Sequence, residues 1–218
     1  MLKKLTNRVD DALKTAGLTW MDLSARAEQI ILFGSTAVGC DRPDSDVDLL
    51  CVGEGKDLDT GRLHLLWIKN QCFRDPLWLG SEIGTHVAQY GVWLKGKPTF
   101  AASSAPHPRA LERKRERIFR RAHALLRNWA ALSPRFRAAQ RRKLRLDVQR
   151  LELLQRGLAV KPNPLLDQNW RNKRNRVKWL KAVLSGEGDL WRVVESVMKM
   201  PLGNRLPRFE HLQEPSCG

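Results

Sequence analysis

Two short polar segments carry the residue types that could do phosphate chemistry. The first, Gly34-Ser35, follows the apolar run 30–33, and the second, Asp46-Val47-Asp48, opens an apolar run that continues to residue 52. Because side chains two apart on a strand point to the same face, Asp46 and Asp48 would present two carboxylates side by side. Such like charges repel unless a cation lies between them, and oxygen ligands of this kind suit Mg²⁺, with Mn²⁺ as the alternative.

The glycine and serine supply the complementary half of such a site. Gly34 has no Cβ, so a phosphate could approach its backbone closely. Ser35 adds a hydroxyl group and a backbone N–H. A phosphate cradle beside metal-holding carboxylates provides the groups that nucleotidyl transfer requires, because metal ions can clamp the attacking and leaving oxygens.

Phe-Gly-Ser, a spacer, and then Ser-Asp-Val-Asp-Leu-Leu occur in that order, with ten residues between Ser35 and Asp46. This order resembles the DNA polymerase β-like nucleotidyltransferase superfamily, in particular its small bacterial members, over roughly residues 25–68. The resemblance implies a small mixed sheet flanked by helices. It also implies a metal pair held by three carboxylates, the third of them on a neighbouring strand.

The sequence departs from that pattern in two places. His64 stands where the third carboxylate is expected, and an imidazole there could ligate a metal or act as a base. Asp59 in the preceding loop is an alternative third ligand, Glu82 at a helix start is a weaker one, and the third ligand could also be missing. Val38 stands where small members often have an arginine, which leaves Arg42 as the candidate phosphate contact in this loop.

Hydrophobic patterning predicts the elements that position these residues. Strands are expected over 30–33, 47–52 and 63–68, and a helix capped by Ser81 is expected to run to Lys95. We predict an α+β fold, with a nucleotidyltransferase domain over 1–100, a linker over 101–108, a basic helical domain over 109–200 and a tail over 201–218. The helices expected in the basic domain include 111–129, 137–156 and 168–184.

The charge of the chain is concentrated in one region. The net charge is +16, and residues 109–181 hold 23 Lys and Arg against 5 Asp and Glu. A block of one sign favours a polyanionic partner, and we predict RNA, with an acidic protein as the alternative. The candidate RNA contacts are Arg113, Lys114, Arg117, Arg121, Arg141, Arg142, Arg171, Lys173 and Arg174.

These observations predict an enzyme that moves a nucleoside monophosphate from an NTP, ATP or CTP first, to a hydroxyl on RNA such as a tRNA end, releasing pyrophosphate. A catalytically weak nucleotide- or RNA-binding module is one alternative, and a protein-adenylylating enzyme of the toxin–antitoxin type is another. Apolar runs of roughly 18–20 residues, which a membrane span needs, are absent from the sequence, and we read no signal peptide. Four cysteines form neither a zinc spacing nor a disulfide framework, so a cytoplasmic location is expected.

Overall fold

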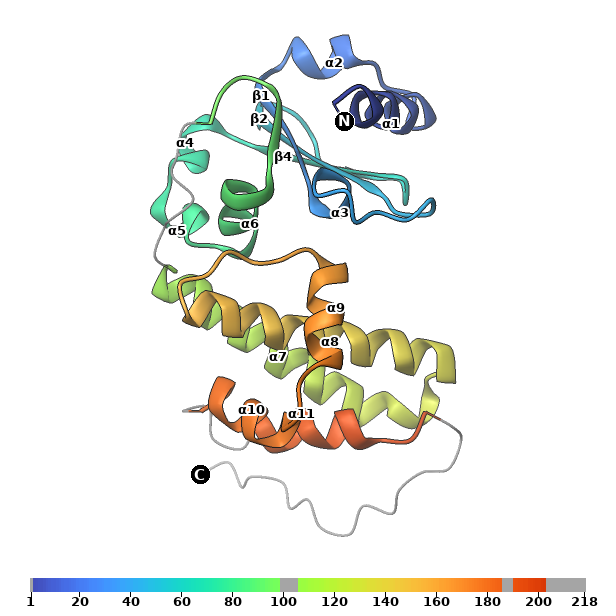
Figure 1. Ribbon diagram of the computed structural model, residues 1–218, viewed down its shortest axis with the longest axis vertical. Helices are drawn as coiled ribbons and strands as arrows, with labels where there is room; N and C mark the ends of the chain where they lie inside the picture. Colours follow the sequence, from blue (N-terminus) through green and yellow to red (C-terminus); the bar gives the residue numbers. More distant parts are fainter. Residues whose placement is uncertain (1, 99–105, 186–189, 203–218) are drawn as a thin grey trace. The chain divides into compact units, whose positions relative to one another are not determined.

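The computed structural model describes residues 2–98, 106–185 and 190–202 (Figure 1). By contacts the chain divides into two compact units: the first combines Met1–Arg115 with Gln149–Lys173, and the second combines Glu116–Val148 with Arg174–Gly218. The boundary between the units runs through two long helices. Most of the linker expected at 101–108, and most of the tail expected at 201–218, lie outside the described residues.

A five-stranded sheet organises the first unit, with strand order β3-β4-β2-β1-β5. β2 and β4 run parallel, whereas the other neighbours are antiparallel, so the sheet is mixed, as the sequence predicts. The predicted α+β fold is therefore confirmed. The strands are β1 (Ala27–Phe33), β2 (Val47–Gly53), β3 (Leu58–Asp59), β4 (Leu63–Ile68) and β5 (Val92–Lys95).

Helices cover the central strands on both faces (Figure 1). On one face, Val9, Leu13 and Leu23 join the buried cluster that includes Ile30 and Leu49. On the other face, residues of β1 and β2 cluster with Phe73 and Val87. Burial on both faces explains why residues 30–33 of β1 and 49–52 of β2 are continuous apolar runs. The helices are α1 (Leu2–Thr15), α2 (Trp20–Ser24), α3 (Gly34–Ala37), α4 (Asn70–Phe73), α5 (Pro76–Leu79) and α6 (Glu82–Tyr90).

The segment after Ser81 corrects one expectation. The predicted helix from Ser81 to Lys95 was too long, because α6 ends at Tyr90 and the next residues form β5. Gly91 adopts extended backbone angles, φ −67° and ψ 140°, which stop the helix. Val92 and Trp93 then pair with β1, at Leu32 and Ile31 respectively. Pairing with a sheet edge outweighs the local helical period of these residues.

The remaining helices are long in the middle of the chain and short towards its end. Residues of α7 and α8 belong to both units, α9 belongs to the first, and α10 and α11 belong to the second. The helix predicted over 111–129 is present as α7, and its buried face includes Ile118, Ala122 and Leu125. The elements are α7 (Pro108–Asn128), the 3₁₀ turn η1 (Trp129–Ala131), α8 (Pro134–Gln155), α9 (Asn163–Arg171), α10 (Arg176–Val183) and α11 (Leu190–Lys199).

Two further observations bear on the environment of the chain. Within the described residues, no helix combines the length and apolar character that a membrane crossing demands. Cys40, Cys51 and Cys72 are free thiols, while Cys217 lies outside the described residues.

Candidate active site

The turn between β1 and α3 requires a glycine for two separate reasons. Gly34 has φ +74°, a left-handed conformation that other residues rarely adopt. A Cβ at this position would also collide with Oδ2 of Asp48. The carboxylate of Asp48 therefore lies directly against the backbone of the turn, as a site combining phosphate and metal contacts needs.

Strand pairing places the acidic residues beside this turn. Asp48 on β2 lies opposite Phe33, the last residue of β1, and opposite His64 on β4. Asp46 precedes β2, and its carbonyl oxygen accepts a hydrogen bond from Thr36 Oγ1 at 3.3 Å. The glycine turn and both aspartates thus gather at one end of β1 and β2.

The loop that joins the two motifs is held from α1. Arg8 forms an ion pair with Asp41, and its guanidinium also donates to the carbonyl oxygens of Arg42 at 2.7 Å and Ser45 at 3.1 Å. Arg42, a predicted nucleotide contact, is exposed, and its backbone N–H donates to Ser45 Oγ. These contacts involve backbone atoms of Arg42, so its side chain remains accessible to a ligand.

Burial and the neighbouring Asp48 raise the free energy of the ionised form of Asp46. The pKa of Asp46 lies above its ordinary value, first because the protein displaces part of its hydration and then because Asp48 is negatively charged nearby. Asp46 is exposed and Asp48 is half-buried, so both carboxylates can be reached from solvent.

His64 lies among three acidic residues. Its Nδ1–H donates to Oδ1 of Asp48 at 3.0 Å, since a carboxylate can only accept. The pKa of His64 is raised, chiefly by this hydrogen bond and further by the charges of Asp48, Asp59 and Asp46, while burial opposes the change. Asp59 pairs with His64 across β3 and β4, and its Oδ1 accepts from the backbone N–H of Gly61 at 3.0 Å.

Glu82, the weaker candidate for a third ligand, has other partners. Its two carboxylate oxygens form ion pairs with Lys114 and Arg150, each at 2.8 Å. These contacts tie α6 to α7 and α8 within the first unit. Of the three candidates, the structure pairs His64 with Asp48, and it pairs Asp59 with His64 on the next strand.

A buried histidine on α6, which sequence reasoning missed, contacts the glycine turn. The backbone N–H of Gly34 donates to Nε2 of His86 at 3.1 Å, and Nδ1–H of His86 donates to the carbonyl oxygen of Val160 at 2.6 Å. Both contacts together require the neutral imidazole with its proton on Nδ1. Burial lowers the pKa of His86, which favours that form.

Residues 21–81 match the nucleotidyltransferase domain family. This part of the chain is therefore similar to a nucleotidyltransferase domain. This match spans the glycine turn, both aspartates and His64, and it is consistent with a member of the DNA polymerase β-like superfamily, as the motif predicts. The match ends before α6 and the basic helices. No curated protein matches the chain.

A nucleotidyltransferase domain generally uses an NTP together with a divalent metal ion. The donor set fits such an ion, because Asp46 and Asp48 are oxygen ligands whose mutual repulsion a cation would relieve. Within residues 2–98, 106–185 and 190–202, no three His, Cys, Asp or Glu side chains are grouped so as to hold a metal ion. Mg²⁺ beside one or two carboxylates usually takes its other ligands from water and substrate phosphates.

The nucleotidyltransferase domain is followed by the predicted RNA contacts, which the structure distributes over both units. Lys114, Arg121, Arg141 and Lys173 have partners within the fold: Glu82, Asp147, two carbonyl oxygens of the α11 end, and Glu152 respectively. Lys114 is almost fully buried. The exposed members of the predicted set are Arg113, Arg117, Arg142, Arg171 and Arg174.

Proposed function

We propose that this chain is an active nucleotidyltransferase that moves a nucleoside monophosphate from an NTP to an acceptor hydroxyl on RNA and releases pyrophosphate. The observation that carries the proposal is the contact between the Gly34 turn and the carboxylate of Asp48, with Asp46 beside it. It is supported by the nucleotidyltransferase domain match over the same residues.

Asp46 and Asp48 would hold the divalent ion, Mg²⁺ or Mn²⁺. When bound, the ion would neutralise developing charge on the transferred phosphoryl group. Strand pairing and the hydrogen bond from His64 hold the carboxylate of Asp48, and the hydrogen bond from Thr36 holds the backbone of Asp46.

The turn would bind the NTP phosphates, and Gly34 and Ser35 would contribute to this in different ways. The N–H of Gly34 is already donated to His86, so the glycine contributes close approach rather than a hydrogen bond. Ser35 therefore supplies the polar contact, through its hydroxyl group and its backbone N–H. Arg42, exposed in the neighbouring loop, would add a positive charge to the same phosphates.

The positive charge of residues 109–181 is the reason for proposing RNA as the acceptor. Residues 109–181 carry 23 basic and 5 acidic residues, and a small-molecule acceptor requires no such excess. A tRNA end is one acceptor of this class, with ATP or CTP as the NTP. An acidic protein that the enzyme adenylylates would also complement this charge. Labelling of RNA or of protein distinguishes these two acceptors.

A second candidate function has an observation in its favour. His64 occupies the position across from Asp48 where a carboxylate is expected, and it donates a hydrogen bond to that residue. A domain with only two carboxylates could bind nucleotide and RNA with little or no transfer. In that case NTP binding would persist while product formation would be absent.

The test is incubation with each α-³²P-labelled NTP, Mg²⁺ or Mn²⁺, and total RNA or total protein, followed by a denaturing gel. We expect label in RNA, and loss of that label in the Asp46→Asn and Asp48→Asn variants, which remove one carboxylate each without changing side-chain volume. Label in protein would favour the adenylylating alternative. Wild-type rates in both variants would refute the assignment of the site.

A further inference from the structure

The second unit contains a groove with an unusual combination of side chains. Its volume is about 530 Å³, and it lies between α7, the turn that follows η1, and the first turns of α8. One part is cationic and the other is apolar. The residues that line it include Arg117, Arg120, Arg121, Asn128, Phe136 and Gln140.

A buried carboxylate orients the cationic part. Asp147 has a side chain that is only 3% exposed, and it forms an ion pair with Arg121 and approaches Arg117 at 4.0 Å. Arg120 is exposed at the groove. Two of the three guanidinium groups thus share one buried carboxylate, which leaves a net positive charge. Because Asp147 already restrains two of them, less side-chain entropy is lost when an anion binds.

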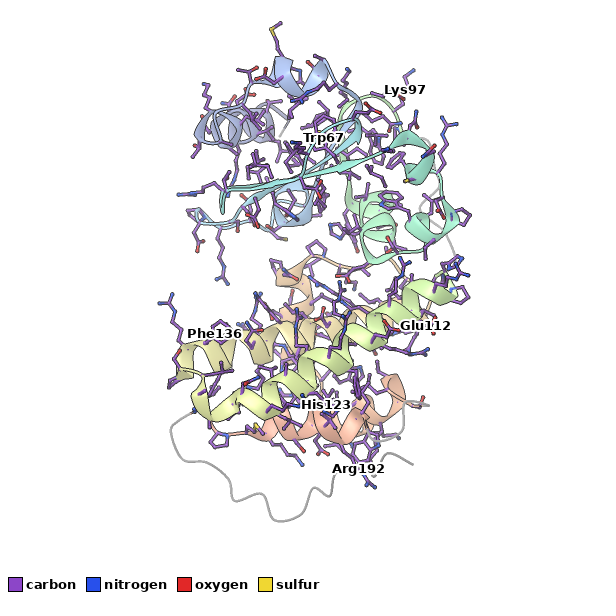
Figure 2. All side chains as sticks on the ribbon, turned by 180° about the vertical axis from the view of Figure 1, so that it is seen from behind. Trp67, Lys97, Glu112, His123, Phe136 and Arg192 are labelled. Carbon is purple, nitrogen blue, oxygen red and sulfur yellow. The ribbon has the colours of Figure 1, made fainter. Side chains whose placement is uncertain are left out.

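The apolar part offers an aromatic surface. Phe136 near the start of α8 is 49% exposed, although aromatic rings are usually more buried (Figure 2). The amides of Asn128 and Gln140 also line the groove. An exposed ring beside guanidinium groups matches the chemistry of one nucleotide, in which a base can stack and a phosphate can pair with arginine.

We propose that this groove binds a nucleotide of single-stranded RNA, with its base stacked on Phe136 and its phosphates at Arg117 and Arg120. The proposal rests on the proposed function, in which RNA is the acceptor, and it adds the place where the RNA is held. An acidic peptide is a less suitable occupant. It would pair with the arginines of the groove, but it has no base to stack on Phe136.

The test uses fluorescence anisotropy of a fluorescein-labelled single-stranded RNA of mixed sequence with the full-length protein. Phe136→Ala should weaken binding about tenfold, a typical effect of losing one stacked base, and Phe136→Trp should restore it. Phe119→Ala is the matched control, because Phe119 is also 49% exposed but does not line the groove. Arg120→Gln should weaken binding and flatten the slope of log affinity against log salt by about 0.7.

Each outcome has one meaning. If the Phe136→Ala and Phe119→Ala variants bound RNA with equal affinity, the proposal that the groove binds RNA would be overturned, while RNA binding by the protein would still hold. No binding of RNA by the wild-type protein at low salt would overturn both the groove and the RNA acceptor. Poly-glutamate that binds as tightly as RNA at the same salt, and loses affinity equally in Phe136→Ala, would replace RNA with an acidic peptide. Unchanged melting temperatures establish that the variants fold.

Discussion

At the scale of single residues, the candidate site depends on mutual contacts that restrict several positions at once. Gly34 cannot accept a Cβ because Asp48 lies against it, and its N–H has a buried histidine as acceptor. Asp48 in turn accepts a hydrogen bond from His64. The identity of each residue is therefore explained by its neighbours in space, several of which are distant in sequence.

His64 is the residue whose replacement is most informative. His64→Ala should reduce transfer strongly, because it removes the hydrogen bond that orients Asp48. His64→Asp would add a fourth carboxylate to a region that already holds Asp46, Asp48 and Asp59. Without metal, the repulsion should lower the melting temperature of this variant. Adding Mg²⁺ should then raise the melting temperature of the variant more than that of the wild type. Thermal melts with and without MgCl₂ measure this, and equal responses in both proteins would argue against a metal beside His64.

His86 should make the stability of the fold depend on pH. Burial lowers its pKa in the folded protein, whereas in the unfolded chain it titrates near its ordinary value of 6.5. Its contribution is therefore fully present above pH 6.5 and is lost as the pH falls towards the folded pKa, because the unfolded chain binds the proton more readily. Asp48 and Glu82 oppose this lowering of the pKa, and Arg150 adds to it.

The measurement is urea unfolding at pH 7.5 and 5.5, with His86→Phe for comparison. The wild type should lose more free energy of unfolding between these pH values than the variant, by at most about 1.4 kcal/mol per pH unit. At pH 7.5 the variant should be the less stable protein, because the Gly34 N–H loses its acceptor, at a cost of about 1 kcal/mol. Identical pH dependence in both proteins would show that His86 is not held neutral.

At the scale of elements, helix α6 connects the site to more distant segments. One helical turn separates Glu82, which forms ion pairs with Lys114 and Arg150, from His86, which contacts the glycine turn and Val160. The same face of α6 thus holds parts of α7 and α8 and the segment before α9. Residues 149–173, which include Arg150 and Val160, belong to the first unit.

Removing the carboxylate of Glu82 should destabilise this connection. Glu82→Ala takes an ion-pair partner from Lys114, whose side chain is only 2% exposed, and should lower the free energy of unfolding by about 3 kcal/mol. Lys114→Met should cost less, because the apolar stem is retained and Glu82 keeps Arg150. Chemical denaturation measures both.

Glu112→Ala, at an exposed position of α7 labelled in Figure 2, is the control and should stay within about 0.5 kcal/mol of the wild type. If Lys114→Met proved more costly than Glu82→Ala, packing of the lysine stem, and not charge pairing, would be what holds α6.

At the scale of the whole molecule, the positive charge is the property that bears on the partner. Arg113, Arg171 and Arg174 are exposed, so changing all three to Gln should leave the fold intact. If they contact phosphates, affinity for unrelated RNA sequences should fall similarly, and the slope of log affinity against log salt should flatten by about 2. Titration of labelled RNA at several salt concentrations measures both quantities.

The matched control changes three exposed basic residues outside the basic region, Lys14, Lys56 and Arg74, to Gln. It removes the same net charge from the protein but leaves residues 109–181 unaltered, so it should leave the slope nearly unchanged. A control that flattened the slope equally would mean that RNA responds to total charge and not to residues 109–181.

The sequence by itself determined the α+β class, the central strands, the nucleotidyltransferase motif and the location of the charge. Each of these features depends on residues that lie close together in the sequence. Residues 30–33 of β1 and 49–52 of β2 are buried on both faces of the sheet and are continuously apolar, and the motif lies in two short segments that strand pairing brings together. The likeness to a nucleotidyltransferase domain is confirmed for residues 21–81, whereas the roles of Asp46, Asp48 and His64 stay predictions.

Only the tertiary structure decided the features that depend on distant partners. Val92–Lys95 is a strand because β1 offers it an edge, and His86 contacts residues that lie 52 and 74 positions away in sequence. Lys114 is a basic residue in a basic region, yet it is buried against Glu82, 32 residues earlier. Local periodicity indicates which side of an element is apolar, but it does not indicate which group a polar side chain will contact in the folded chain.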